Sequence, residues 1–311
     1  MGNRAIVTGG AGFIGSHVVD ALLADGYEVG VVDDLSSGSA ENVADGARLH
    51  EVDIVDVAAL DAVFEQEQPS TVFHLAAQAS VVASVADPGR DCDVNVRGTL
   101  NVLQAAGRLG APVIFSSTGG ALYGDAAPRP TPEDRIPAPL SPYGASKWAA
   151  EAYVRTWALS SGIPHVVCRL GNVYGPRQSP HGEAGVVAIF TGRIHDRRPP
   201  VLYGHGKPTR DYIYVDDVVA AMMAAAAAGR PGVFNIATSV ETDVETVWRV
   251  LSEAAGVELQ AEYADLRPGE LQHSCLDIKR AVAELGWSPQ VPIDQGLHRS
   301  FEALSAEIER A

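Results

Sequence analysis

An α/β protein with a doubly wound parallel sheet and a smaller, interleaved C-terminal α/β lobe is the fold class that the sequence predicts. Over the first 170 residues, short β-branched segments alternate with longer helical patterns. Such alternation with short turns is typical of βαβ units, in which the strands run parallel. After Gly171 the alternation gives way to loops rich in glycine and proline. We therefore expect one large domain and a second lobe built from the later segments.

The expected elements follow in chain order. The strands of the first domain are predicted at 5–8, 28–32, 48–52, 71–75, 113–117 and 164–169, with helices at about 13–25, 56–67, 91–109 and 142–161. Later helices are predicted near 184–195, 242–255, 278–285 and 293–309. Segments 211–215 and 233–236, with an alanine-rich helix between them, suggest a return to the main sheet. The predicted domains are therefore residues 1–170, joined by about 211–237, and a lobe of residues 171–210 and 238–311.

The composition of the 311 residues excludes several classes of protein. The formal net charge of −16 argues against a surface that binds nucleic acid. No apolar run approaches the ~20 residues that a membrane-spanning helix needs. The cysteines, Cys92, Cys168 and Cys275, have no metal-ligand spacing and are typical of reduced thiols. We therefore expect a cytoplasmic globular protein without a metal centre, a nucleic-acid partner or a membrane partner.

Three glycines after the first strand indicate a dinucleotide site on a Rossmann sheet. Gly9, Gly12 and Gly15 fall where the strand ends and a helix begins. Glycine permits a tight turn there and lets a pyrophosphate approach the helix N–H groups closely. Asp33 closes the second strand eighteen residues after Gly15, where a carboxylate binds an adenosine ribose and repels a 2′-phosphate. Because no arginine follows at 34–37, NAD is expected rather than NADP.

Other candidate cofactor contacts lie near the carboxyl ends of the strands. Asp53 either meets the adenine edge or only forms a turn, and Asn95 either lies at the site or only makes hydrogen bonds within its helix. His74 is expected to be a core histidine rather than a catalyst. The remaining candidates are Phe13, Ile14, Asp34, Ser37, Gly38, Ile54, Leu75, Ala76, Ala77, Gln78 and Ser116.

Tyr143 and Lys147 are the candidate catalytic pair. Residues four apart on a helix share one face, so the ammonium would lie close to the phenol. An unperturbed tyrosine has a pKa near ~10, so a base active near neutrality needs a pKa roughly 3 units lower. We expect the lysine cation and a bound oxidised nicotinamide to supply that change. Both residues are therefore also expected to contact the cofactor.

These motifs, with Asn95 and Ser116-Ser117-Thr118, make the chain similar to the extended short-chain dehydrogenase/reductase superfamily, from Ala5 to about Pro289. Segments 171–177, 210–217, 267–270 and 285–287 resemble motifs of its nucleotide-sugar enzymes. The resemblance implies that Asn172, Arg210 and Arg267 bind a nucleoside diphosphate, in keeping with the bidentate binding of phosphate by arginine. It also implies a uracil near Tyr203. The further substrate-binding candidates are Ser80, Ser117, Thr118, Gly119, Tyr143, Arg177, Val187 and Arg193.

The residues after Thr118 narrow the reaction. Related 4,6-dehydratases carry an Asp-Glu pair there and nucleotide-glucuronate decarboxylases carry a Glu, whereas this chain has Gly119-Gly120-Ala121. The sequence therefore resembles the NAD-dependent UDP-hexose 4-epimerases, which pass through a 4-keto sugar. The resemblance implies that Thr118 bonds the sugar 4-oxygen, Tyr143 takes the 4-hydroxyl proton and Lys147 keeps Tyr143 acidic. A net nucleotide-sugar reductase or dehydrogenase and a catalytically idle dinucleotide-binding regulator are the alternatives.

The sugar is less clearly indicated than the reaction. Animal- and plant-type UDP-glucuronate epimerases carry arginines in segment 79–84 and at position 179, and this chain has neither. Segment 175–185 looks more like bacterial UDP-glucose epimerases, and the small Ser274 leaves an N-acetyl sugar possible. The chain as a whole nevertheless resembles the UDP-glucuronate 4-epimerases of actinomycete antibiotic pathways of the moenomycin type. UDP-glucuronate is therefore the expected substrate, with UDP-glucose and UDP-N-acetylglucosamine as alternatives.

A 6-carboxylate on the sugar would need a cation to bind it. Arg193, with Arg177 and His181 behind it, is the expected cation, although Arg193 could equally cap a helix end or lie on the surface. The resemblance also implies a homodimer, formed through the helices at 91–109 and 142–161.

Overall fold

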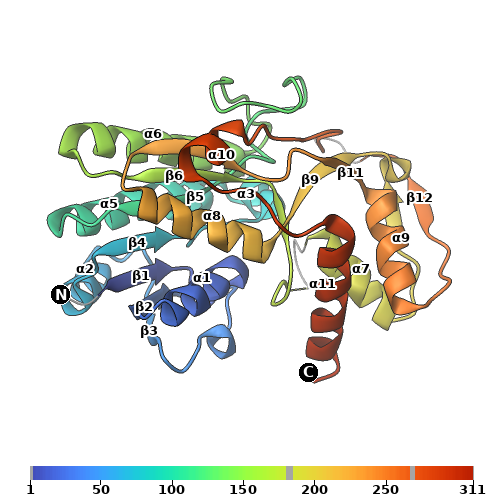
Figure 1. The fold of residues 1–311 in the computed structure, drawn as a ribbon, viewed down its shortest axis with the longest axis horizontal. Helices are drawn as coiled ribbons and strands as arrows, with labels where there is room; N and C mark the ends of the chain where they lie inside the picture. Colours follow the sequence, from blue (N-terminus) through green and yellow to red (C-terminus); the bar gives the residue numbers. More distant parts are fainter. Residues whose placement is uncertain (1–2, 180–184, 267–269, 311) are drawn as a thin grey trace. The chain divides into compact units, whose positions relative to one another are not determined.

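The computed structural model (Figure 1) describes residues 3–179, 185–266 and 270–310. Its largest sheet contains β1 (Arg4–Thr8), β2 (Glu28–Asp33), β3 (Arg48–Glu51), β4 (Thr71–His74), β5 (Val113–Thr118), β6 (Val166–Leu170) and β10 (Gly232–Ile236). The strand order is β10-β6-β5-β4-β1-β2-β3. In the parallel register, Ile6 of β1 lies opposite Gly30 on one side and Val72 on the other. The predicted fold class, a doubly wound parallel sheet, is confirmed.

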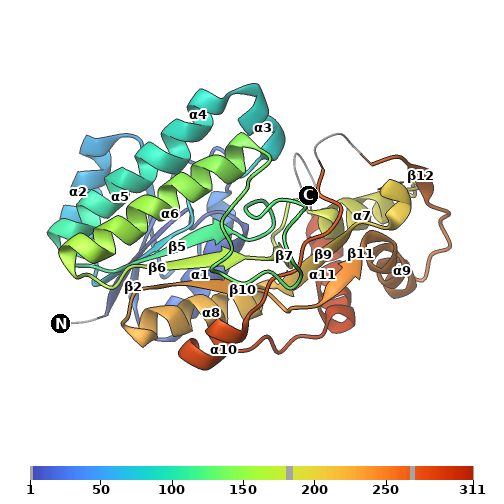
Figure 2. The same ribbon diagram turned by 90° about the horizontal axis from the view of Figure 1, so that it is seen from above.

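Helices cover both faces of this sheet, as Figure 2 shows. On one face lie α2 (Val57–Glu67), α5 (Thr99–Arg108) and α6 (Pro142–Ser161), and on the other lie α1 (Phe13–Ala24) and α8 (Val215–Ala228). Side chains such as Ile6, Val102 and Phe115 are 0% exposed in the core between the sheet and the first face. Strands buried on both faces explain why their sequences are nearly continuous apolar runs.

The helix expected at 91–109 is more complex than its sequence suggests. The structure has α3 (Val81–Ala86) and α4 (Pro88–Cys92), then a π-helical segment Asp93–Gly98 that continues into α5. Pro88 stands in the first turn of α4, and the Asp87 side chain caps it by accepting a hydrogen bond from the Arg90 N–H. π-helical turns inside helices are often found at functional sites. Here the turn contains Asn95.

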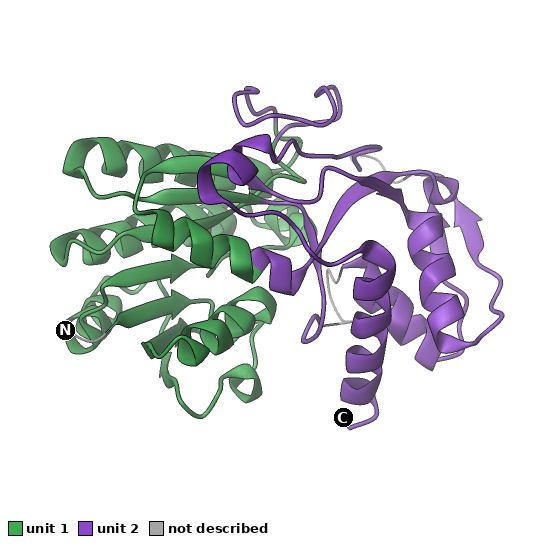
Figure 3. Ribbon diagram, in the orientation of Figure 1, with its two compact units in different colours: residues 1–122, 139–169, 219–234 green, residues 123–138, 170–218, 235–311 purple. Residues whose placement is uncertain are grey.

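The chain divides into two compact units (Figure 3). The first unit comprises residues 1–122, 139–169 and 219–234, and the second comprises 123–138, 170–218 and 235–311. Segment 123–138 therefore falls in the second unit, although the sequence suggested that it continues the first domain. The reason is local pairing, because the Thr131 N–H donates to the Cys275 carbonyl and the Asp277 N–H donates to the Thr131 carbonyl, both at 2.9 Å.

The second unit has its own sheets and core. Strand β9 (Thr209–Tyr214) lies between β7 (Asn172–Tyr174) and β11 (Glu241–Asp243), and β8 (Val201–Tyr203) pairs with β12 (Glu262–Ala264). The expectation that segment 211–215 returns to the main sheet is therefore wrong. Tyr212 and Tyr214 instead pack edge-on against Tyr174 inside the second unit.

Four helices complete the described elements of the second unit. They are α7 (Val186–His195), α9 (Val244–Ala255), α10 (Lys279–Leu285) and α11 (Ile293–Ile308). Short 3-10 turns lie at Ala40–Asn42 and Gly204–Gly206. In the described part of the chain, every helix is too short or too polar to cross a bilayer.

Candidate active site

The turn between β1 and α1 has the shape of a dinucleotide-binding loop. Gly9 has φ +71°, and a Cβ there would lie 2.6 Å from the Ala76 nitrogen after β4. A Cβ at Gly15 would lie 2.0 Å from the Gly9 carbonyl oxygen, so the helix can start this close to the strand only with glycine. A Cβ at Gly12 would meet only the Gly9 oxygen within 4 Å. The space beside Gly12 is thus open for a ligand.

The start of α1 offers backbone donors to that space. Phe13 and Ile14 form its first turn, and no side chain caps it. A helix N-terminus without a cap carries N–H groups and a partial positive charge suited to a phosphate. Gly38 packs against the same turn, because a Cβ at Gly38 would lie 2.9 Å from the Ala11 carbonyl carbon.

Asp33 lies at the end of β2 beside the glycine turn. Its side chain is buried and accepts hydrogen bonds from the Ala11 N–H at 2.9 Å and the Leu35 N–H at 3.0 Å. Burial raises the pKa of Asp33 above its usual value, against the lowering effect of these two bonds. Each carboxylate oxygen keeps a second lone pair for a ribose hydroxyl. The glycine turn, the uncapped helix and this carboxylate together fit NAD.

Other predicted cofactor residues have partners within the chain. Asp34 accepts hydrogen bonds from the N–H and hydroxyl of Ser36, while Ser37 is exposed. The Asp53 carboxylate forms an ion pair with the Arg90 guanidinium at 3.1 Å, and the neighbouring Ile54 is buried. Asp53 therefore has an ionic partner that its sequence position did not suggest.

A buried hydrogen-bond network joins the residues after β4 to α6. The Asn95 side chain accepts from the Gln78 N–H at 2.9 Å and donates to the Gln78 carbonyl and the Ser146 hydroxyl, both at 3.0 Å. The Gln78 amide in turn bonds the backbone of Ser80, whose hydroxyl caps α3. Leu75 and Ala76 donate their N–H groups to Thr8. Gln78 and Asn95 thus fix the chain path past Ala77.

His74 is a core histidine, as the sequence predicted. Its side chain is 0% exposed, with Nδ1 2.6 Å from the Thr8 hydroxyl and Nε2 2.9 Å from the Thr99 hydroxyl. Because Thr99 donates to the Asn95 carbonyl, it accepts from Nε2–H, which assigns the neutral tautomer. Burial, with the Lys147 charge, lowers the pKa of His74 to about 3. The Ser116 hydroxyl donates to the His74 carbonyl at 3.2 Å.

The structure brings Thr118, Tyr143 and Lys147 together. Thr118 ends β5, and its hydroxyl is hydrogen-bonded to the Tyr143 phenol. Tyr143 and Lys147 stand one turn apart on α6, which begins at Pro142 with the Ser141 side chain as its cap. The Lys147 ammonium is buried 4.3 Å from the centre of the Phe115 ring. After Thr118, Gly119 and Gly120 offer no acidic side chain.

Burial dominates the electrostatics of this pair in the chain alone. Burial, opposed by the hydrogen bond with Thr118 and aided by the Asp91 charge, raises the pKa of Tyr143 to about 12. Lys147 is not among these causes. Burial lowers its own pKa to about 7, against the charges of Glu151 and Asp91, so its positive charge is partial near neutrality. The chain alone therefore does not make Tyr143 acidic, and the lowering expected from Lys147 together with a bound oxidised nicotinamide stays a prediction.

Ser117 points to a buried ion pair rather than to an open space. Its hydroxyl donates to Glu151 at 2.5 Å, and the Arg169 guanidinium donates to both oxygens of Glu151 at 2.7 to 3.1 Å. Glu151 and Arg169 are 1% and 3% exposed. A hydroxyl has one proton, so Ser117 cannot also donate to a substrate. Ser117 thus links β5, next to Thr118, to the buried Glu151–Arg169 ion pair.

A cavity of about 760 Å³ lies within the second unit. Five of the predicted substrate-binding residues line it: Asn172, Val187, Arg193, Tyr203 and Arg210. The sequence reasoning missed other residues of its lining, among them Gln178, Phe190 and Tyr212. Phe190 and Tyr212 read as core residues in the sequence, and only the fold shows that they also face a cavity. Arg267 lies outside the described residues.

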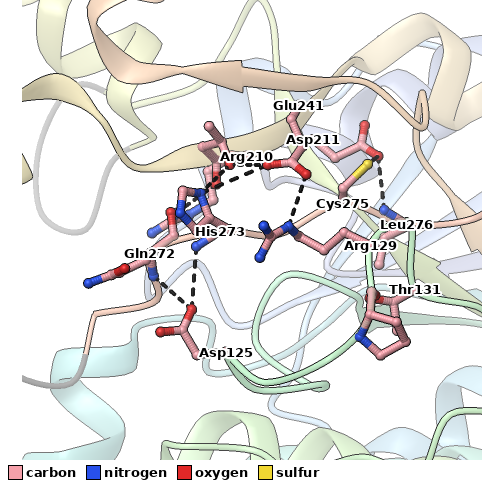
Figure 4. Close-up of polar contacts among 12 residues, drawn as sticks. Asp125, Arg129, Thr131, Arg210, Asp211, Glu241, Gln272, His273, Cys275 and Leu276 are labelled. Atoms are coloured by element: carbon pink, nitrogen blue, oxygen red, sulfur yellow. Dashed lines mark hydrogen bonds and ion pairs between the residues drawn. The ribbon is translucent and has the colours of Figure 1, made fainter.

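Arg210, which lines the cavity, is held by backbone carbonyls, and Figure 4 shows it beside Gln272. Its guanidinium donates to the carbonyls of Thr209 at 2.9 Å, Leu271 at 2.8 Å and Gln272 at 3.4 Å. The Asp125 carboxylate fixes this segment from the other side by accepting the Gln272 N–H at 2.9 Å. Arg177, by contrast, is not part of the lining, and its N–H donates to Glu307 at 3.1 Å.

Comparison with known proteins places this geometry in a family. Residues 5–237 match the model of the NAD dependent epimerase/dehydratase family. The chain belongs to this family. The matched residues include the glycine turn, Asp33, Thr118, Tyr143 and Lys147. Membership of an NAD dependent family agrees with the dinucleotide-binding shape of the glycine turn.

Individual members of the epimerase/dehydratase family are similar over nearly the whole chain. The UDP-glucose 4-epimerase of Mycolicibacterium smegmatis is 44% identical over 96% of this chain and 97% of its own length. The structure of Thermotoga maritima UDP-glucose 4-epimerase with UDP-glucose has a TM-score of 0.96 at 45% identity, covering 98% and 99% of the two chains. The Thermus thermophilus UDP-glucose 4-epimerase complex with NAD has a TM-score of 0.91 at 42% identity, covering 97% and 99%. The chain is thus an NAD-dependent enzyme.

Proposed function

We propose that the protein is a UDP-hexose 4-epimerase that works through a 4-keto sugar. The Thr118–Tyr143 hydrogen bond, with Lys147 one turn further along α6, is the observation that carries this proposal. The absence of an acidic residue at 119–121 separates the site from one that eliminates water. Solved relatives with UDP-glucose and with NAD support the same reaction.

The chain's own residues have distinct tasks in this mechanism. Thr118 orients the sugar 4-oxygen, and Tyr143 takes the 4-hydroxyl proton and later returns it. NAD⁺ held by the glycine turn and Asp33 would supply a reversible acceptor for the C4 hydride and a positive charge that would lower the pKa of a nearby phenol. Lys147 stabilises the phenolate to the extent that it is protonated. The buried Glu151–Arg169 pair, bonded to Ser117, holds α6 against β5 and so fixes Tyr143 and Lys147 relative to Thr118.

The second unit supplies anchors for the nucleotide. Arg210, whose guanidinium is fixed by three carbonyls, is placed to meet the diphosphate with Asn172. Tyr203 in the same lining is suited to the uracil, and Arg267, outside the described residues, is expected to add a second cation. A substrate anchored by its diphosphate leaves the hexose free to turn and present either face of C4.

Two hexoses are supported by different observations. The similarity to UDP-glucose 4-epimerases at 44% and 45% identity favours UDP-glucose and UDP-galactose. Arg193 favours UDP-glucuronate as well, because this half-buried guanidinium lines the cavity and has no ion-pair partner among the described residues. A cation at a cavity wall without an anion suits a ligand carboxylate. We propose that the enzyme accepts both and that Arg193 reads the 6-carboxylate.

Replacing Arg193 with alanine should therefore raise KM for UDP-glucuronate by about 10-fold, as expected for loss of one charge-assisted hydrogen bond. KM for UDP-glucose should change by less than about 2-fold. Steady-state kinetics on both sugars measure the difference. Arg198→Ala is the matched control, since Arg198 is 65% exposed and, unlike its ion-pair partner Asp196, is not part of the lining. Equal losses on both sugars would remove Arg193 from carboxylate recognition.

Proton NMR of the purified enzyme tests the reaction itself. UDP-glucose, UDP-glucuronate and UDP-N-acetylglucosamine are each incubated with the enzyme without added NAD. We expect galacto-type anomeric signals from the first two sugars, because an epimerase regenerates its bound cofactor in each cycle. Turnover only with added NAD, in stoichiometric amounts, would instead identify a dehydrogenase or reductase.

We further propose a homodimer formed through the helices of the face that carries α5 and α6. Trp148, Tyr153 and Leu159 of α6 are 40%, 41% and 88% exposed, which is unusual for large apolar side chains on one helix. Sedimentation equilibrium should give twice the chain mass, and Tyr153→Glu should shift the species towards the monomer. A monomer for the unsubstituted protein would contradict this assembly.

A further inference from the structure

Asp91 is a buried carboxylate beside the catalytic pair that the mechanism above does not use. It lies on α4, is 1% exposed, and accepts hydrogen bonds from the Gln78 amide at 2.9 Å and the Asn95 amide at 3.1 Å. Both described side-chain partners are neutral. Neither of these two bonds therefore brings a positive charge to the carboxylate.

The same network leads from Asp91 to α6. The Asn95 amide that donates to Asp91 also donates to the Ser146 hydroxyl at 3.0 Å, and Ser146 donates to the Tyr143 carbonyl at 3.0 Å. Lys147 follows Ser146 in the chain. Burial has the largest effect on the pKa of both Tyr143 and Lys147; the Asp91 charge raises the pKa of each, for Lys147 after the larger contribution of Glu151.

The other ionisable groups near Lys147 are either neutral or already bound to a cation. His74 of β4 is neutral, with a pKa of about 3. Tyr143 on the same helix is neutral until it gives up its proton. Glu151, one turn further along α6, is already bound by the Arg169 guanidinium and the Ser117 hydroxyl. Asp91 is thus the carboxylate near Lys147 without a cation of its own among the described residues.

We propose that Asp91 is a counter-charge that, together with Glu151, favours the protonated form of the Lys147 side chain, and so acts on catalysis as a positioning residue. A lysine in an apolar site loses its proton readily unless an anion faces it. The catalytic consequence rests on the proposed epimerase function. The protonation of Lys147 does not depend on that function, so it can be measured separately.

Lysine-selective NMR measures that protonation directly. The chain has only three lysines, Lys147, Lys207 and Lys279, and the last two are 78% and 90% exposed. In the unsubstituted protein Lys147 should titrate at about 7. Asp91→Asn keeps an oxygen that can accept both amide bonds and removes the charge. The Lys147 midpoint should then fall by roughly 1 unit, while the two surface lysines stay unchanged.

Asp93→Asn is the matched control. Asp93 stands two residues further along the chain, is 47% exposed and pairs with Arg97 at 3.3 Å. Its substitution should leave the Lys147 midpoint in place. An unchanged midpoint in Asp91→Asn, or an equal shift in Asp93→Asn, would overturn the proposal. If Asp91→Asn is too unstable to purify, the double variant Asp91→Asn with Lys147→Met should be stable enough to purify, because it no longer buries an ammonium group without a facing anion. A double variant as unstable as Asp91→Asn would contradict an interaction between Asp91 and Lys147.

The pH profile of kcat gives a second readout that a merely structural role would not move. Because the Asp91 charge raises the pKa of both Tyr143 and Lys147, Asp91→Asn should displace the acid and alkaline limbs together towards lower pH. A uniform loss of activity with both limbs in place would contradict the proposal. If Tyr143→Phe proved active, the epimerase mechanism would fail, and the lysine titration would still decide the role of Asp91.

Discussion

Replacing Tyr143 with phenylalanine is expected to lower kcat for UDP-sugar epimerisation by about 10²–10⁴-fold, the usual range for a general base. The phenol is the group that accepts the 4-hydroxyl proton, and the neighbouring Thr118 hydroxyl cannot replace it because its own pKa is far higher. The fold should persist, since only one hydroxyl and its hydrogen bond with Thr118 are lost. Coupled assays for galacto-configured product measure kcat, and circular dichroism reports the fold.

Tyr153→Phe is the matched control for this substitution. Tyr153 lies on the same helix and is 41% exposed. Its kcat should stay within about 2-fold of the unsubstituted enzyme, as for most surface changes away from a site. Substantial turnover by Tyr143→Phe would remove the tyrosine from the base role.

Replacing Glu151 with alanine should have the largest effect on stability. It leaves the Arg169 guanidinium buried without its bidentate carboxylate, and removal of one partner of a buried ion pair costs about 3–5 kcal/mol. The Ser117 hydroxyl loses its acceptor in the same step. Urea unfolding should show a lower midpoint with a similar slope. Activity should fall with the folded fraction, because Thr118 follows Ser117 directly.

Glu253→Ala provides the comparison for an exposed pair. Glu253 bonds Arg249 at 2.9 Å on the surface of α9, with both side chains more than half exposed. Its loss should cost less than about 0.5 kcal/mol. The double change Glu151→Leu with Arg169→Met should recover most of the stability, since apolar replacement of a whole buried pair is often neutral. A loss of less than about 1 kcal/mol in the unfolding free energy of Glu151→Ala would contradict this prediction, because it would mean that water solvates the Arg169 guanidinium.

Much of the first unit could be predicted from the sequence because its signals are local. Gly9 and Gly15 stand where a Cβ would collide with the backbone, and strands buried on both faces are continuous apolar runs. The four-residue spacing of Tyr143 and Lys147 fixes their common face on any helix. These inferences needed no knowledge of distant contacts.

Other features depend on contacts that spacing does not reveal. Strand β9 reads like a strand of the main sheet, but its tyrosines are buried by Tyr174 in the second unit. The sequence did not show that the Ser117 hydroxyl donates a hydrogen bond to Glu151, thirty-four residues later. Asp91 stood out by no motif, because its importance arises from burial next to Lys147. The net charge of −16 likewise gave no sign that two arginines, Arg193 and Arg210, line one cavity.

The transfer of the hydrogen at C4 tests the central claim most directly. UDP-glucose or UDP-glucuronate carrying deuterium at C4 is incubated with the enzyme in ordinary water, and the product is analysed by NMR and mass spectrometry. The account predicts that the product keeps the deuterium at C4, because the same hydrogen leaves and returns to one carbon. Loss of the label to solvent, with inversion at C4, would contradict it.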